Sequence, residues 1–145
     1  LEGAEEMANS TYDLGEYIKK LIEKEDLNLE LGRVESSTAY HTPCHLKSQE
    51  IGRPFVELLK KIPGLEFEDL DTGCCGLSGS FGYQSDRYEI SQGVASELYR
   101  AIEQAKPDKG VSECGACQLQ MEGGTGLTIE HPITILRRSL EAEGE

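Results

Sequence analysis

The sequence has little positive charge and no long apolar segment. Its 14 Lys and Arg residues face 27 Asp and Glu residues, which gives a formal net charge of −13 at pH 7. This balance argues against nucleic acid or an anionic lipid surface as the direct partner, whereas a basic protein or a neutral quinone is compatible with it. No apolar run approaches the ~20 residues that span a bilayer, and no charged-then-apolar leader is present. We therefore expect no membrane span and no secretion signal.

An internal repeat, a low-complexity segment and an initial methionine are also missing. The 145 residues are enough for one domain with a sizeable core. A composition of 37% hydrophobic and 28% charged residues is typical of a globular chain. Because the sequence begins Leu1-Glu2-Gly3, we expect a fragment of a longer protein or a processed chain.

The five cysteines are an odd number, which does not suit a scaffold made of disulfides alone. Cys74 and Cys75 are adjacent, and adjacency strains the geometry that a disulfide between them would need. Two thiolates directed at one metal centre explain this pair better. Without a secretion signal, clustered cysteines are more often metal-binding or catalytic.

The cysteines form three groups along the chain: Cys44 alone, the pair Cys74 and Cys75, and the CxxC pair Cys114 and Cys117. The middle pair lies in a run from Asp71 to Gly82 that contains four glycines. Glycine lets the backbone adopt positive φ and approach a bulky ligand closely. The pattern therefore indicates a loop that wraps around something large.

Hydrophobic periodicity predicts strands that alternate with helices. The predicted strands cover residues 34–40, 65–70, 110–113 and 127–130. The predicted helices cover residues 10–25, 54–62, 85–105, 117–121 and 132–140, and residues 1–9, 123–126 and 141–145 are expected to be loose or looped. Ser10 with Asp13 three positions later indicates the start of the first helix.

Two of the predicted helices have an apolar face that we interpret as core packing. In the first helix the face consists of Leu14, Tyr17, Ile18, Leu21 and Ile22. In the helix over residues 85–105 it consists of Tyr88, Val94, Leu98, Ala101, Ile102 and Ala105.

The alternation of strands and helices predicts an α/β fold, with a mostly parallel sheet of about four strands flanked by helices. Ligands of such sheets bind outside the carboxyl ends of the strands. Each cysteine group follows a predicted strand, and so does His131. We expect all of these side chains at one end of a single domain over residues 36–145, preceded by a helical lead-in over residues 1–35.

The order of one Cys, then Cys-Cys-Gly, then Cys-x-x-Cys resembles the cysteine-rich CCG domain family over roughly residues 36 to 136. That family includes the B subunit of heterodisulfide reductase and the iron–sulfur subunits of glycolate and lactate oxidases. The flanking residues look most like the C-terminal CCG domain in the C subunit of anaerobic glycerol-3-phosphate dehydrogenase. These flanks are the segments Tyr40–His45, Glu113–Gln120 and Glu130–Ile133.

Sulfur ligands suit zinc, copper(I) or iron–sulfur clusters, and four of them complete a zinc site or an ordinary cubane. Five leave one over, which fits a centre with a bridging thiolate. The resemblance implies a non-cubane [4Fe–4S] cluster, held by Cys44, Cys74, Cys75, Cys114 and Cys117, which the isolated fragment can lose in air. Zinc is the alternative, since some domains of the family hold it. A thioredoxin-like dithiol at the CxxC pair is a third interpretation.

The residues expected around the centre are three histidines, two glycines and a serine: His41, His45, His131, Gly76, Gly115 and Ser78. Backbone N–H groups at glycine turns and helix starts place positive partial charge near an anionic cluster. Hydrogen bonds to cluster sulfurs tune its potential. The alternatives are zinc ligation or a strand-end position for His41 and His45, loop polarity for Ser78, and anchoring of the last turn for His131.

The resemblance implies electron transfer within a membrane-associated oxidoreductase of glycerol metabolism and anaerobic respiration. In such complexes a flavoprotein subunit oxidises the substrate, and the iron–sulfur and membrane-anchor subunits pass electrons towards quinone. The run from Gly79 to Gly82 is too short for a dinucleotide fingerprint, so we expect no substrate oxidation by this chain alone. We expect a cytoplasmic or inner-membrane peripheral protein. The rival interpretation is a zinc-stabilised docking module, or a CCG domain of a related reductase or oxidase.

Overall fold

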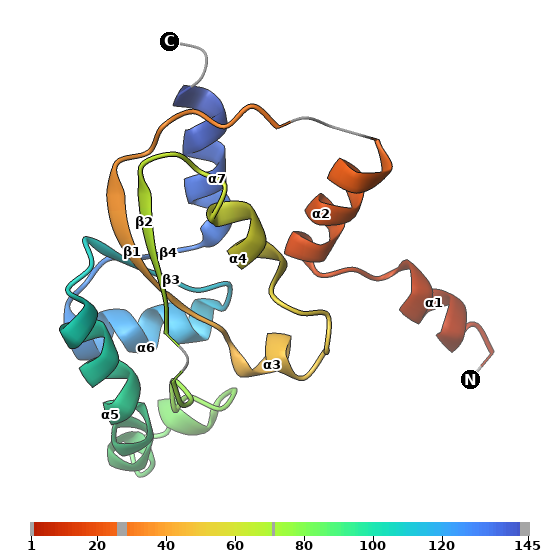
Figure 1. The fold of residues 1–145 in the computed structure, drawn as a ribbon. Coiled ribbons are helices and arrows are strands. Elements are labelled where there is room, and N and C mark those ends of the chain that lie inside the picture. The colour runs from red at the N-terminus through yellow and green to blue at the C-terminus, as the bar shows by residue number, and fades with distance from the viewer. Residues whose placement is uncertain (1, 26–28, 71, 143–145) are drawn as a thin grey trace.

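The computed structural model describes residues 2–25, 29–70 and 72–142, and within them four strands form one parallel sheet (Figure 1). The strands are β1 (Ser36–His41), β2 (Leu65–Leu70), β3 (Lys109–Val111) and β4 (Ile129–Glu130). Their spatial order is β2-β1-β3-β4, and all three pairings are parallel. The predicted α/β class is confirmed.

Helices cover both faces of the sheet. Helices α5 (Tyr88–Ala105) and α6 (Gly115–Thr125) pack on one face, and α4 (Pro54–Leu59) and α7 (Pro132–Glu141) pack on the other (Figure 1). Because side chains alternate along a strand, Ala39 of β1 enters the first core and Tyr40 enters the second. None of the helices in these residues is both long and apolar enough to cross a membrane.

The amino-terminal helices differ from the prediction. Residues 4–9, expected to be loose, form most of α1 (Ala4–Ser10), and α2 (Leu14–Lys24) begins after a break. Asp13 caps α2 by accepting a hydrogen bond from the Gly15 N–H, whereas Ser10 ends α1 and donates its hydroxyl back to the Glu6 carbonyl. The predicted start at Ser10 was wrong because two helices meet here, and Asp13 is the cap.

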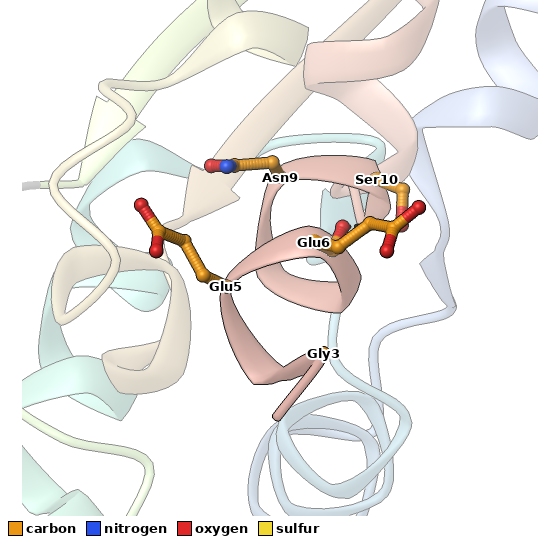
Figure 2. Close-up of a pocket in the computed structure, with 5 residues that line it drawn as sticks. All are labelled: Gly3, Glu5, Glu6, Asn9 and Ser10. Carbon is orange, nitrogen blue, oxygen red and sulfur yellow. Dashed lines mark hydrogen bonds between the residues drawn. The ribbon is translucent and has the colours of Figure 1, made fainter. Parts of the chain in front are cut away.

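Helix α1 buries none of its residues. Figure 2 shows the shallow hollow beside it, which is lined by Gly3, Glu5, Glu6, Asn9 and Ser10. The carboxylates of Glu5 and Glu6 point away from each other, so they do not converge on a common point (Figure 2). The hollow contains no thiol or imidazole and has no part in the candidate site.

The contact faces of α2 and α5 were only partly predicted. In α2 the residues that reach the core are Gly15, Ile18 and Ile22, while Leu14 and Tyr17 are exposed. Gly15 lies against the Phe55 ring of α4, so close that a Cβ there would come within 2.7 Å of a ring carbon. The division at residue 35 stays a prediction, because α2 packs against the domain that it precedes.

Helix α5 is rotated from the predicted face. Its buried residues are Ser91, Ala95, Leu98 and Ile102, whereas Tyr88 and Val94 are exposed. Residues 123–125, predicted as a loop, are the last turn of α6. Of the predicted cysteine run, Asp71 lies outside the described residues, as do residues 143–145 of the predicted loose end.

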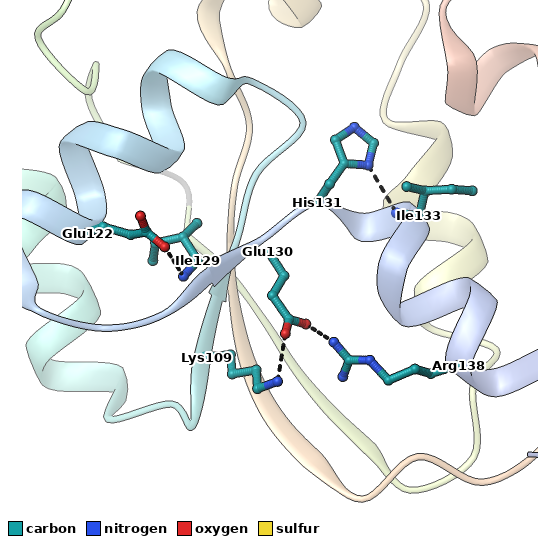
Figure 3. Close-up of polar contacts among 7 residues, drawn as sticks. All are labelled: Lys109, Glu122, Ile129, Glu130, His131, Ile133 and Arg138. Atoms are coloured by element: carbon teal, nitrogen blue, oxygen red, sulfur yellow. Dashed lines mark hydrogen bonds and ion pairs between the residues drawn. The ribbon is translucent and has the colours of Figure 1, made fainter.

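A partly buried carboxylate joins the far edge of the sheet to α7. Glu130 of β4 accepts hydrogen bonds from Lys109 of β3 and Arg138 of α7 (Figure 3). Burial favours a higher pKa for Glu130, but these two cations lower the pKa overall. The Glu122 carboxylate of α6 accepts from the Ile129 N–H at 3.1 Å, which ties α6 to the same strand.

Candidate metal centre

The three cysteine groups follow three adjacent strands. Cys44 begins the short helix α3 (Cys44–Lys47) after β1, Cys74 and Cys75 follow β2, and Cys114 follows β3. Since β2, β1 and β3 are neighbours and parallel, their carboxyl ends share one edge of the sheet. The fold therefore brings to one end of the molecule residues that are far apart along the chain.

The thiols of Cys75 and Cys117 are in direct contact. Their Sγ atoms are 3.1 Å apart and both side chains are buried, and Cys117 donates a hydrogen bond to Cys75. This bond lowers the pKa of Cys75 to about 6 and raises the pKa of Cys117. A disulfide has an S–S distance near ~2.05 Å, so the two residues are free cysteines joined by a hydrogen bond.

Cys44 and Cys74 line a common cavity of about 260 Å³. The remaining lining residues are His41, Thr42, Lys47, Thr72 and Gly73. Burial raises the pKa of Cys74 against the lowering effect of a 3.4 Å hydrogen bond from the Gly76 N–H, and the nearby Cys75 and Cys44 raise it further. Cys74 is therefore close enough to Cys75 and Cys44 for their charges to affect its pKa.

Cys114 is the N-cap residue of α6 and is half-buried. Its neighbour Glu113 accepts a hydrogen bond from the Tyr40 hydroxyl of β1, and burial raises the pKa of both groups. Ser112 donates its hydroxyl to the His41 carbonyl at 3.0 Å. These two links fix the start of α6, with its CxxC pair, to the end of β1.

Gly76 allows the Cys-Cys-Gly loop to lie against α5. Its φ is +87°, and a Cβ on this residue would come within 2.2 Å of the Ser91 carbonyl oxygen. The Ser91 hydroxyl donates to the Gly76 carbonyl at 3.0 Å and accepts from Gln120 Nε2 at 2.9 Å. Since Gln120 is about one turn beyond Cys117, this buried relay joins the backbone beside Cys75 to the helix that carries Cys117.

Sequence reasoning missed Ser91 and Gln120. The signal for Ser91 was its place at i in the i, i+4, i+7, i+11 stripe with Ala95, Leu98 and Ile102, where an apolar residue is usual. A polar residue in such a stripe is buried with a partner. For Gln120 no comparable signal exists, because its partner lies on another helix.

The structure places the expected surrounding residues in different environments. His41 is buried beside the Cys44 cavity, and burial together with Lys47 lowers its pKa to about 4. His45, Ser78 and Gly115 are exposed. Ser78 has a left-handed backbone with φ +46°, and Gly115 is the first residue of α6.

His131 lies at the start of α7. Its Nδ1 accepts a hydrogen bond from the Ile133 N–H at 3.1 Å (Figure 3). Its ring also meets the Phe55 ring edge-on, with ring centroids 5.6 Å apart. Because Nδ1 accepts this hydrogen bond, it carries no proton, and burial lowers the pKa of the His131 side chain. The contacts match the alternative role of anchoring the final helix.

The arrangement of thiols differs from a site for a single ion. Across the described residues, no three Cys, His, Asp or Glu side chains are grouped tightly enough to hold one. A tetrahedral zinc site has Zn–S bonds near ~2.3 Å, which places its sulfurs about 3.8 Å apart. Here Cys75 and Cys117 form one buried pair, and Cys44 and Cys74 form a second pair that lines a cavity. All-sulfur donors spread in this way fit a larger iron–sulfur centre better than a single ion.

Thiols at the carboxyl ends of three parallel strands, in an α/β domain, are features of the class of sulfur-rich metal-binding domains. The family model described as "Cysteine-rich domain", CCG, matches residues 38–122. The chain belongs to this family, as its cysteine pattern predicted.

Several curated proteins are similar to the chain. The C subunit of anaerobic glycerol-3-phosphate dehydrogenase from Escherichia coli (strain K12) is 40% identical over 116 residues, which are 80% of this chain and 29% of that protein. Lactate utilization protein A from Bacillus licheniformis is 30% identical over 129 residues, 86% of this chain and 52% of that protein. An uncharacterized iron-sulfur protein from Methanocaldococcus jannaschii is 38% identical over 80 residues, 54% of this chain and 16% of that protein. The chain thus spans between about a sixth and about half of these relatives.

Proposed function

We propose that this chain is an iron–sulfur electron-transfer domain of an oxidoreductase complex. The observation that carries the proposal is the set of free thiols that follows three adjacent parallel strands at one edge of the sheet. Membership of the cysteine-rich family and the similarity to a protein described as an iron-sulfur protein support it.

The residues that would hold the group are Cys44, Cys74, Cys75, Cys114 and Cys117. An iron–sulfur cluster, of [4Fe–4S] and non-cubane type in our proposal, supplies one-electron redox chemistry when bound. The chain itself orients the thiols: Gly76 lets the backbone of its loop approach α5, and Tyr40 with Glu113 fixes the start of α6. Leu77 and Met121 are buried in the core that contacts Cys75 and Cys117, and they exclude water from that side.

The complex that we propose is of the anaerobic glycerol-3-phosphate dehydrogenase type. The 40% identity to the C subunit of that enzyme supports this choice over the lactate utilization relative from Bacillus licheniformis, which is 30% identical. In this arrangement a flavoprotein subunit oxidises the substrate, and this domain passes electrons towards quinone through subunits bound peripherally at the inner membrane. The domain alone would oxidise no substrate.

Anaerobic reconstitution with iron and sulfide tests the cofactor. We expect a brown protein with iron and acid-labile sulfide, a paramagnetic signal on change of redox state, and a lower iron content in each single Cys→Ser variant. A colourless protein that holds zinc would instead support the docking module. Full iron and an unchanged spectrum in Cys75→Ser would overturn the five-cysteine site.

The place in the electron path needs the intact complex. Replacement of Cys74 and Cys75 by serine should stop quinone reduction but leave the flavoprotein subunit able to reduce an artificial dye, because the two reactions use different centres. Circular dichroism first checks that the variant is folded, since a metal centre also stabilises its domain. Normal quinone reduction by a folded, cluster-free complex would remove this domain from the path.

A further inference from the structure

The cavity between Cys44 and Cys74 has an unusual polar wall. Four buried side-chain N or O atoms among the described residues have no hydrogen-bond partner, and three of them belong to residues that line this cavity. These three are His41 Nδ1, Thr42 Oγ1 and Thr72 Oγ1. The fourth belongs to Asp69, whose other carboxylate oxygen pairs with Arg53.

Such atoms are uncommon because an unpaired buried polar group costs free energy. His41 and Thr42 are only 2% and 3% exposed, so bulk water does not satisfy them. Their concentration at one cavity, with two thiols on the same wall, indicates that the missing partner is a ligand in that cavity.

We propose that Thr42, Thr72 and His41 donate hydrogen bonds to the sulfur atoms of the group held between Cys44 and Cys74, and so raise its affinity for an electron. This inference rests on the proposed function. Hydroxyl and imidazole N–H groups are donors, and thiolate and sulfide sulfurs are acceptors. A donor stabilises the reduced form most, because that form carries more negative charge.

The Lys47 side chain at the same cavity supports an electron-rich ligand. It contributes a positive charge in a chain whose net charge is −13, and it lies beside the same two thiols. A cavity with hydroxyl donors, a cation and thiol ligands is complementary to an anionic sulfur centre. The same wall would not suit an apolar ligand, which would leave the three polar atoms unpaired.

Thr38 provides a matched control for the two threonines. It is also buried and lies in β1, but its hydroxyl donates to the Glu66 carbonyl at 3.2 Å and does not line the cavity. Thr→Val keeps the side-chain shape and removes only the hydroxyl. Thr42→Val and Thr72→Val should therefore act on the bound group, and Thr38→Val should act on the protein alone.

The first measurement is an anaerobic redox titration of the reconstituted chain, followed by its absorbance and paramagnetic signal. At a fixed potential, loss of one ordinary hydrogen bond should lower the ratio of reduced to oxidised centre about fivefold in Thr42→Val and in Thr72→Val. The double variant should show the product of the two effects, with unchanged iron and sulfide content. Shifts no larger than that of Thr38→Val would overturn the proposal.

The second measurement needs no metal. In urea denaturation of the metal-free chain, Thr42→Val and Thr72→Val should be neutral or stabilising, because each replaces an unpaired buried hydroxyl by a methyl group. Thr38→Val should be destabilising, because it removes a bond to the Glu66 carbonyl. Equal destabilisation by all three would mean that the cavity hydroxyls have protein partners, and the proposal would fail.

The outcomes separate this inference from the proposed function. If the wild-type chain takes up no iron and sulfide under anaerobic conditions, the proposed function fails and the inference falls with it. If the chain takes up iron and sulfide but Thr42→Val and Thr72→Val leave the reduction potential of the centre unchanged, only the inference fails.

Discussion

Gly76 is the residue whose replacement should harm the candidate site most while leaving every thiol in place. Gly76→Ala adds a Cβ at positive φ and within 2.2 Å of the Ser91 carbonyl oxygen, so strain and overlap act together. We expect a loss of at least about 2 kcal/mol in the free energy of unfolding, measured by urea denaturation.

Two other glycines separate these causes. Gly79 has φ +66° but open space around its Cα, so Gly79→Ala should cost only the conformational strain of about 1 kcal/mol. Gly115 has neither positive φ nor a close neighbour, and Gly115→Ala should be near neutral. Equal effects at Gly76 and Gly79 would mean that α5 does not constrain the loop.

Ser91 supports the loop from the other side. Ser91→Ala leaves Gln120 Nε2 and the Gly76 carbonyl without this partner, and it should cost about 1–3 kcal/mol. Ser96→Ala in the same helix removes an exposed hydroxyl that bonds only the Gly93 carbonyl, and should change stability by less than about 0.5 kcal/mol. Chemical denaturation compares the two, and a Ser91→Ala protein as stable as Ser96→Ala would contradict the relay.

At the scale of elements, two adjacent glycines in α6 behave differently. A Cβ at Gly124 would overlap the Tyr99 ring of α5 at 2.1 Å, whereas Gly123 has no neighbour within 4 Å. Gly124→Ala should destabilise by about 1–3 kcal/mol, and Gly123→Ala should stabilise by about 0.5–1 kcal/mol through helix propensity. Thermal unfolding midpoints that move in the same direction would show that α5 and α6 do not touch here.

The same glycines show why some elements could be predicted and others could not. Strand β2 was predicted at its observed bounds because Leu65 and Phe67 alternate with charged residues. The end of α6 was misplaced because Gly123 and Gly124 resemble a loop, and the Tyr99 ring that requires Gly124 is distant in sequence. Likewise, the contact face of α2 depends on Gly15, a residue that no hydrophobicity pattern marks.

The candidate site could also be predicted only in part. Five cysteines after predicted strands, with a glycine beside Cys75, could be placed from local patterns. The polar residues that complete the site could not, because Ser91, Gln120 and Thr72 acquire their meaning only from partners on other elements. The residue type alone does not tell whether a hydroxyl is buried at the site or exposed on the surface, because this depends on its neighbours in space.

At the scale of the whole molecule, the net charge of −13 opposes compaction. Screening should reduce this repulsion, so added sodium chloride up to about 0.5 M should raise the midpoint of thermal unfolding. The link of Glu130 with Lys109 and Arg138 is mostly buried and should resist the same salt. A midpoint that falls steadily with salt would show that ion pairs outweigh the general repulsion.

The central position of β1 also has a consequence for the order of assembly. During synthesis β1 can pair with β2 once residue 70 has emerged, but its other edge waits for β3 at residues 109–111. Until then Cys44, Cys74 and Cys75 lack the counterparts that arrive with α6, and the nascent thiols are open to oxidation or to stray metal ions. In a chain built in this order, a centre held by all five cysteines would form only after residue 117 has emerged.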